Sequence, residues 1–274
     1  MSEYFMAPSL GAILDLAVKR MRRGLGCSLL LTGPPGGGKT SFARELAKRL
    51  EAGFHYYSGS PDRERDLLYE VDVKGVLERK NAWIPGPAWQ AFQESSTRSS
   101  VLLIDEVDKT HPGFDAFLLR LLEEWSFRSP GGETITANPF GLAVVLTSNG
   151  RRALRPEVLR RCQRIALPLP TGERLKEVIR STVPGTRIPQ GLLDLLIRLG
   201  DLVGNLSEED RPSPKEVGLC AVDLLNLAAD SSDQETFQLV ATSWLVKGGG
   251  LKLLEEAAKG FRWGRALLTE ASRE

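Results

Sequence analysis

The sequence predicts an α/β protein with a parallel sheet flanked by helices, followed by a smaller all-α domain. Short apolar runs alternate with helix-type stretches, a pattern typical of parallel strands joined by helices. A glycine-rich segment directly follows the first run, and strand-like runs stop after Pro168 and Pro170. We expect an α/β domain over residues 1–170, a helical lid domain over 171–247 and an amphipathic tail over 248–274. The predicted strands are Ser28–Leu31, Phe54–Tyr57, Val101–Ile104, Ala143–Leu146 and Ile165–Leu167.

The composition is that of a globular protein without a strong charge bias. The chain has 274 residues, of which 42% are hydrophobic, and 36 basic and 35 acidic side chains give a formal charge of +1. This length suffices for a sizeable core, and the charge balance excludes a global field that attracts nucleic acid or anionic membranes. The N-terminus lacks a signal-peptide pattern, and no apolar run approaches a membrane span. We therefore expect a cytoplasmic protein without membrane insertion.

Cysteine and histidine usage argues against disulfide and zinc sites. Cys27, Cys162 and Cys220 are far apart and odd in number, which favours a reducing compartment and buried, inert thiols. Neither His55 nor His111 lies at metal-ligand spacing with a cysteine or a second histidine. The sequence predicts no zinc site built from protein ligands.

The segment 33–40, Gly-Pro-Pro-Gly-Gly-Gly-Lys-Thr, matches the phosphate-loop pattern G-x-x-x-x-G-K-[ST] between a predicted strand and a predicted helix. Apolar side chains from Phe42 to Leu50 share one face of that helix. Glycines allow backbone N–H groups to face phosphates, and the helix N-terminus adds a positive dipole end. Lys39 should reach the β- and γ-phosphates of ATP, and Thr40 should ligate Mg²⁺. The predicted nucleotide contacts are Gly33, Pro34, Pro35, Gly36, Gly37, Gly38, Lys39, Thr40 and Ser41.

An acid pair, Asp105 and Glu106, follows the apolar run Val101–Ile104. The carboxyl end of such a strand lies beside the phosphate loop in a parallel sheet. Asp105 is predicted to orient the magnesium shell, and Glu106 to polarise the attacking water. An ordinary solvated turn is the alternative, and the phosphate loop upstream favours the catalytic interpretation.

These motifs resemble the core of an AAA+ ATPase, and most closely its MoxR-like branch. The resemblance extends from near residue 10 to near residue 246 and implies a P-loop AAA+ core. It implies Mg-ATP hydrolysis at the subunit interfaces of a ring, expected to be a hexamer. It also implies remodelling or chaperoning of a protein client, for which partners with a von Willebrand factor A domain are the family precedent. The MoxR-like segments are Pro85-Gly86-Pro87, Asp105–Lys109, Phe114–Glu124, Asn138-Pro139-Phe140 and Val145–Asn149.

The resemblance assigns roles to three further positions in the α/β domain. Asn149 stands where the family has its sensor-one residue, whose amide would hold the attacking water or the γ-phosphate. A plain turn over 148–150 is the alternative. After the short helix Pro156–Leu159, Arg161 is the first choice and Arg160 the second for an arginine finger that reaches the neighbouring subunit's nucleotide. A solvated basic helix end is the alternative for either arginine.

In the second domain, Arg211-Pro-Ser-Pro-Lys215 resembles the sensor-two segment, where the family usually has an arginine at the start of a lid helix. Lys215 stands there instead. Lysine lacks the planar fork of arginine, so closure of the lid on the γ-phosphate is expected to be weaker. Arg211 is the other candidate, and the sequence leaves both open.

Two segments correspond to inserts of the MoxR-like branch, and either could contact a substrate. Asp66–Pro87 is expected to be a loop over the ring pore. Trp125–Asn138 contains Pro130-Gly131-Gly132 between two short runs, a pattern that predicts a β-hairpin. The tryptophans in and near these segments are alternatively core residues: Trp83, Trp89 and Trp125.

Two other functions remain open at this stage. One is a nucleotide-gated binding switch, in which bound ATP and not turnover recruits the partner. The other is a DNA-acting motor, suggested by a cluster of basic residues that a subunit interface also explains. The cluster comprises Arg151, Arg152, Arg155, Arg160, Arg161 and Arg164.

Overall fold

A computed structural model describes residues 8–61, 64–77, 83–206, 211–230 and 234–245. The chain divides into two compact units. Of the described residues, the first unit contains 8–33 and those of 37–168, and the second contains 34–36 and those from 169 to 245. Each unit is described by itself below. The predicted boundaries at 170 and 247 stay predictions, and the predicted tail over 248–274 lies outside the described residues.

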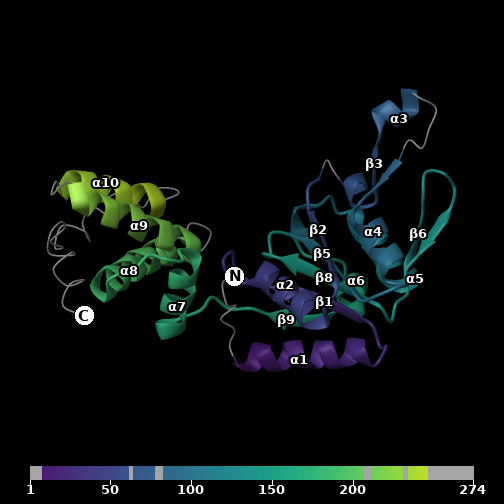
Figure 1. Cartoon of the computed structure of the whole chain (residues 1–274), viewed down its shortest axis with the longest axis horizontal. Helices are drawn as coiled ribbons and strands as arrows, with labels where there is room; N and C mark the ends of the chain where they lie inside the picture. The colour runs from purple at the N-terminus through teal and green to yellow at the C-terminus, as the bar shows by residue number, and fades with distance from the viewer. Residues whose placement is uncertain (1–7, 62–63, 78–82, 207–210, 231–233, 246–274) are drawn as a thin grey trace. The chain divides into compact units, whose positions relative to one another are not determined.

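A five-stranded sheet forms the centre of the first unit, with the strand order β2-β5-β8-β1-β9 (Figure 1). Every neighbouring pair of strands is parallel. Each predicted apolar run therefore forms a strand, and the α/β class with a parallel sheet is confirmed. The last strand starts at Gln163 and not at Ile165 as predicted. The strands are β1 (Cys27–Thr32), β2 (Gly53–Ser58), β5 (Ser100–Asp105), β8 (Leu142–Ser148) and β9 (Gln163–Ala166).

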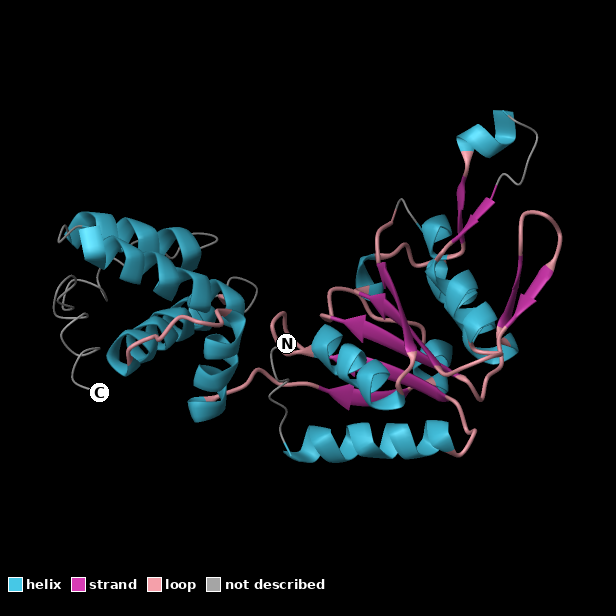
Figure 2. Cartoon of the chain, viewed as in Figure 1, coloured by secondary structure: helices cyan, strands magenta, loops and turns pink. Residues whose placement is uncertain are grey.

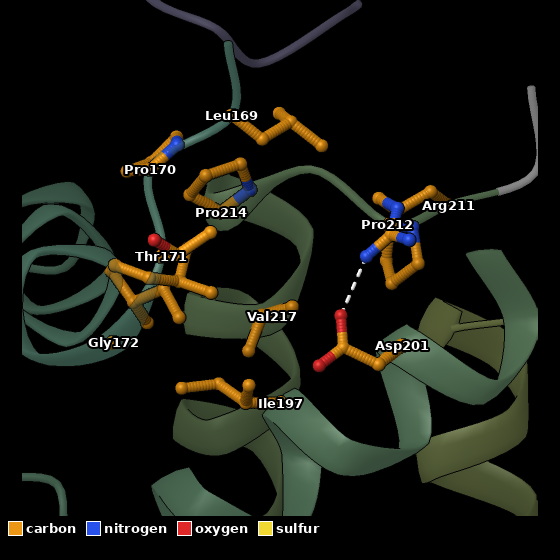
Figure 3. Close-up of a pocket in the computed structure, with 13 residues that line it drawn as sticks. Leu169, Pro170, Thr171, Gly172, Ile197, Asp201, Arg211, Pro212, Pro214 and Val217 are labelled. Carbon is orange, nitrogen blue, oxygen red and sulfur yellow. Dashed lines mark hydrogen bonds and ion pairs between the residues drawn. The ribbon is translucent and has the colours of Figure 1, made fainter. Parts of the chain in front are cut away.

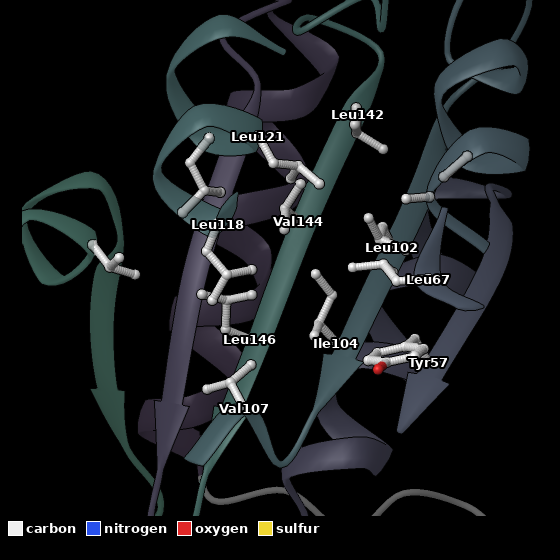
Figure 4. Close-up of a cluster of buried hydrophobic side chains, with 14 of the residues drawn as sticks. Tyr57, Leu67, Leu102, Ile104, Val107, Leu118, Leu121, Leu142, Val144 and Leu146 are labelled. Carbon is white, nitrogen blue, oxygen red and sulfur yellow. The ribbon is translucent and has the colours of Figure 1, made fainter. Parts of the chain in front are cut away.

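Helices cover both faces of this sheet, which explains why every residue of β5 and β8 is buried. On one face, side chains of α4, α5 and α6 pack with Leu102, Val144 and Leu146 in a single cluster (Figure 4). On the other face, α2 packs against β5 and β8, and α1 packs against α2. These helices are α1 (Pro8–Arg22), α2 (Lys39–Leu50), α4 (Pro87–Glu94), α5 (Phe114–Glu124) and α6 (Pro156–Arg161).

Both predicted inserts contain short antiparallel strands. The hairpin expected within Trp125–Asn138 is present as β6 (Ser126–Arg128) paired with β7 (Thr134–Thr136). The first insert holds β3 (Tyr69–Val71) paired with β4 (Trp83–Pro85). Figure 1 shows this pair and α3 projecting from the sheet beyond α4. The remaining short helices of the unit are η1 (Glu64–Leu67), α3 (Val73–Leu77) and η2 (Val107–Lys109).

The tryptophans of this region differ in their surroundings. Trp89 is buried, and its ring meets that of Phe127 edge-on at 6.0 Å between centroids. Trp125 is half-buried and packs against the same core. Trp83 meets Tyr69 edge-on within the first insert, at 5.4 Å. The core interpretation therefore holds for Trp89 and Trp125, while Trp83 stabilises the β3–β4 pair.

The second unit consists of helices and loops in its described part (Figure 2). Buried aliphatic side chains, among them Leu192, Leu196, Val217 and Leu224, form a core of its own. Within the described residues, no helix of the chain is both long and apolar enough to cross a membrane. The helices of this unit are α7 (Gly172–Thr182), α8 (Gln190–Leu206), α9 (Pro214–Asp230) and α10 (Gln234–Leu245).

All three cysteines are free and buried, which confirms the expectation of structural thiols. Burial raises the pKa of the Cys27 thiol to about 11. It raises the pKa of Cys162 and of Cys220 to about 12. Because the thiolate is the reactive form, these side chains are inert near neutral pH.

Candidate functional site

The phosphate-loop sequence forms a glycine-rich turn between β1 and α2. Gly33 has φ 145°, and a Cβ atom there would lie 2.1 Å from the carbonyl oxygen of Leu167. Gly38, the residue before α2, has φ 85° in the left-handed region. Both positions therefore require glycine. Helix α2 then begins at Lys39, so that its N-terminal N–H groups and positive dipole end face this turn.

Lys39 and Thr40 connect the turn to the acid strand. Lys39 is 7% exposed, and its Nζ donates a hydrogen bond to the Gly33 carbonyl oxygen at 2.7 Å. Burial lowers the pKa of Lys39, while the negative charges of Asp105, Asp108 and Glu106 act in the opposite direction. The Thr40 hydroxyl donates to Asp105 Oδ2 at 3.0 Å. The loop and the acid pair thus form one site, as their motifs predicted.

Glu106 lies directly after β5 in a left-handed conformation, with φ 53° and ψ 49°. This conformation is sparsely populated for residues other than glycine and persists only where neighbouring groups hold it. Glu106 Oε1 accepts a hydrogen bond from Asn149 Nδ2 at 3.1 Å. Its Oε2 accepts from Lys109 Nζ at 2.5 Å. The predicted sensor-one residue therefore contacts the predicted water-polarising carboxylate.

Thr147, which the sequence analysis missed, joins the two acids. Its buried hydroxyl donates to Asp105 Oδ1 and accepts the Glu106 backbone N–H at 2.8 Å. Tyr56 adds a longer hydrogen bond from its hydroxyl to Asp105 Oδ2, at 3.4 Å. The only sequence signal for Thr147 was a hydroxyl residue within the apolar strand Leu142–Ser148. Its partners follow from the pairing of β8 with β5.

If the site hydrolyses ATP as its motifs predict, replacing Thr147 with Val should lower that hydrolysis about tenfold or more while changing nucleotide affinity little, because the acid pair loses its orientation. Removing the hydroxyl leaves two buried partners unsatisfied, at a cost of about 1–3 kcal/mol of stability. Thr147→Ser keeps the hydroxyl and serves as the matched control. Steady-state turnover, nucleotide titration and thermal unfolding measure these effects. Equal turnover of the Val and Ser variants would remove Thr147 from this role.

The predicted finger residues lie on the exposed last turn of α6. Arg161 Nη2 forms an ion pair with Glu123 Oε1 of α5 at 2.5 Å, and the Arg161 side chain is 48% exposed. Arg160 is also exposed. In the described residues, the side chains of the acid pair hydrogen-bond to Thr40, Tyr56, Lys109, Thr147 and Asn149, and neither arginine is among these partners.

The predicted sensor-two residues belong to the second unit. Lys215 is exposed in the first turn of α9. Arg211 Nη1 pairs with Asp201 Oδ1 of α8 at 2.5 Å, and a Cβ on Gly204 would lie 2.4 Å from its Nε. This pair lines a largely apolar pocket of about 120 Å³ (Figure 3). Arg211 is therefore anchored within its own unit.

A family model described as AAA domain (dynein-related subfamily) matches residues 28–163. Among curated proteins, mitochondrial Lon protease homolog 1 of Dictyostelium discoideum is 30% identical over 181 residues, or 64% of this chain and 18% of that protein. A mitochondrial Lon protease homolog of Yarrowia lipolytica is 40% identical over 95 residues, or 34% and 8%. Among solved structures, the S. cerevisiae Hsp104–ADP complex has a TM-score of 0.50 at 20% identity, covering 79% of this chain and 43% of that chain.

These comparisons differ in what they support. The matched region contains the phosphate loop, the acid pair, Asn149 and both arginines of α6. The chain spans less than a fifth of the length of the two Lon relatives. The Hsp104 likeness is one of fold. The family model therefore matches the part of the α/β unit that carries the candidate site.

Proposed function

Residues 28–163 belong to the AAA+ ATPase family, and from this premise we propose that the protein hydrolyses Mg-ATP in an assembled ring. The observation that carries the proposal is the hydrogen-bond network from Thr40 through Asp105 and Thr147 to Glu106 and Asn149, with the charge of Lys39 close enough to interact with both acids. It unites phosphate-binding, metal-binding and water-orienting groups at one edge of the sheet.

Thr40 and Asp105 fit the Mg²⁺ ion that such a site uses. Their side-chain oxygens lie 3.0 Å apart, and hydroxyl and carboxylate oxygens are the donors that Mg²⁺ takes in nucleotide sites. The bound ion would neutralise charge on the phosphate oxygens. We assign the phosphate contacts to Lys39 and to the loop over residues 33–41, in which every residue except Pro34 and Pro35 has a backbone N–H.

The remaining residues of the site orient and polarise water. Glu106 is the general base or water-polarising group, and Asn149 holds it through the 3.1 Å hydrogen bond. Each carboxylate oxygen of Glu106 accepts one hydrogen bond, from Asn149 or from Lys109, and retains a second lone pair that can accept a hydrogen bond from the attacking water.

Exposure of the α6 arginines supports a site completed by a neighbouring subunit. We assign the finger to Arg161 first and Arg160 second, because an exposed guanidinium can reach a nucleotide on another copy of the chain. Between the sensor-two candidates we favour Lys215, since Arg211 is already paired with Asp201. Both assignments follow the family resemblance.

Our proposals for the ring size, the cellular location and the client follow the MoxR-like resemblance. We propose a hexameric, cytoplasmic ATPase that remodels or chaperones a protein client, with von Willebrand factor A domain proteins as the first class to test. The two inserts, β3–α3–β4 and β6–β7, are the candidate client-binding elements because both are peripheral to the sheet (Figure 1). Proteolysis is not carried over from the Lon relatives, of which this chain matches only a small part.

Mg-ATP hydrolysis should be measured against protein concentration, with light scattering on the same samples. We expect specific activity to rise as assemblies form, because each site needs an arginine from its neighbour. Tight nucleotide binding by a monomer that stays inactive at every concentration would contradict the ring proposal and support the nucleotide-gated switch. Binding to DNA with a steep salt dependence would support the DNA-acting alternative.

A further inference from the structure

The segment 149–155 connects the water-orienting site to the arginine-bearing helix. It starts at Asn149, whose side chain contacts Glu106, and ends at Arg155, the residue that precedes α6. Helix α6 is short and only Val158 among its residues is buried, so the contacts at its ends contribute to its orientation together with this packing. Two buried carboxylates, Asp108 and Asp115, bind this segment along its length.

Asp108 holds the beginning of the segment. Its side chain lies in η2, two residues after Glu106, and is 5% exposed. Oδ2 accepts the backbone N–H of Asn149 at 3.1 Å and that of Arg151 at 2.9 Å. The turn that carries Glu106 is therefore tied to the turn that carries Asn149.

Asp115 holds the end of the segment. It is 1% exposed in the first turn of α5. Its two oxygens accept Arg152 Nη2 at 2.8 Å and Nη1 at 3.0 Å, and Oδ2 also accepts the backbone N–H of Arg155 at 2.8 Å. A bidentate pair of this kind has a defined geometry, and its buried carboxylate fixes the chain at the residue before α6.

Arg152 extends the connection back to the acid pair. Its Nη2 also donates to the Val107 carbonyl oxygen and to the Thr110 hydroxyl, both at 3.2 Å. Val107 directly follows Glu106, and it is fully buried. The guanidinium thus bridges the turn after Glu106 and the first turn of α5.

We propose that Asp115 is a positioning residue for the α6 arginines, and that its clamp on Arg152 and Arg155 makes the acid-pair turn and α6 move as one body. A change at Glu106 in one subunit is thereby transmitted to the arginines that this subunit offers to its neighbour. The effect on the neighbouring subunit rests on the proposed function. The clamp, meaning the hydrogen bonds of Asp115 with Arg152 and Arg155, does not depend on hydrolysis.

The first test is amide hydrogen exchange on the full chain without nucleotide. Asp115→Asn keeps the side-chain size and removes the charge, and we expect exchange over residues 155–161 to accelerate about tenfold, with α2 unchanged. Glu157→Gln is the matched control, because it removes one negative charge from the first turn of α6 at an exposed position. If Asp115→Asn does not fold, Arg152→Lys keeps the cation and removes the fork. Unchanged exchange in whichever variant folds overturns the clamp.

The second test locates the catalytic defect by mixing subunits. Asp115→Asn alone should lose about 100-fold in turnover while binding ATP normally, since displaced arginines cannot reach the neighbouring site. Mixing with Lys39→Ala subunits, whose α6 is intact, should restore activity because the phosphate site of the Asp115→Asn subunit is undamaged. Absence of restoration places the defect in the subunit's own site and overturns the positioning role. If the wild type itself is inactive in every assembly state, the proposed function fails, and the exchange test still decides the clamp.

Discussion

Replacing Glu106 with Gln is expected to abolish ATP hydrolysis while leaving ATP binding intact. The amide has nearly the same size, and its oxygen can still accept the hydrogen bond from Asn149 Nδ2. It carries no negative charge and cannot take a proton from water, a loss that typically costs about 10²–10⁴ in rate. Lys39 and Thr40, which bind phosphate and metal in our proposal, are unchanged. Single-turnover hydrolysis and equilibrium binding of labelled ATP separate the two effects.

The matched control for this prediction is Glu124→Gln. Glu124 is exposed at the end of α5 and also loses one negative charge on substitution. Its turnover should equal that of the wild type. If Glu106→Gln hydrolysed ATP at the rate of this control, Glu106 would lose its assigned role, and another group would have to polarise the water. The trapped variant, if obtained, is also the best bait for the protein client.

Replacing Arg161 with Ala should inactivate a uniform assembly, and mixing with Lys39→Ala subunits should restore part of the activity. Each variant lacks one half of the shared site. In an equal random mixture about one interface in four combines an intact phosphate loop with an intact arginine. A finger contributes about 10³–10⁵ in rate, so even this fraction stands far above either variant alone. Turnover against mixing ratio is the measurement.

Glu123→Gln controls for the ion pair that the Arg161 substitution also removes. It breaks the contact between Glu123 and Arg161 and keeps the guanidinium. An exposed pair of this kind contributes about 0–1 kcal/mol, so stability and turnover should change little. If mixing restores nothing at any ratio, the finger assignment to Arg161 is wrong, and the same experiment with Arg160→Ala tests the second candidate.

Local sequence patterns were sufficient to predict the main elements of this protein. Apolar runs bounded by polar residues marked all five strands of the sheet, and the runs are clearest for β5 and β8, which bury every residue between two helical layers. Spacing within 33–40 predicted the phosphate turn, since only glycine adopts the φ values found at Gly33 and Gly38. The Asp105-Glu106 pair was visible because it directly follows the apolar run Val101–Ile104, and in the structure Asp105 ends β5 and Glu106 comes next.

Pairings across the sheet could not be predicted in this way. The sequence alone determined an α/β protein with a glycine-rich phosphate turn, an acid pair and a helical second part. Only the tertiary structure placed β8 beside β5, which brings Thr147 to the acid pair and Asn149 to Glu106. It alone revealed that Arg152 donates hydrogen bonds to Asp115, which lies 37 positions earlier in the chain. Such contacts depend on the order of the strands in the sheet. Hydrophobic periodicity indicates which residues of one segment are buried, but it does not indicate which distant residue a polar side chain contacts.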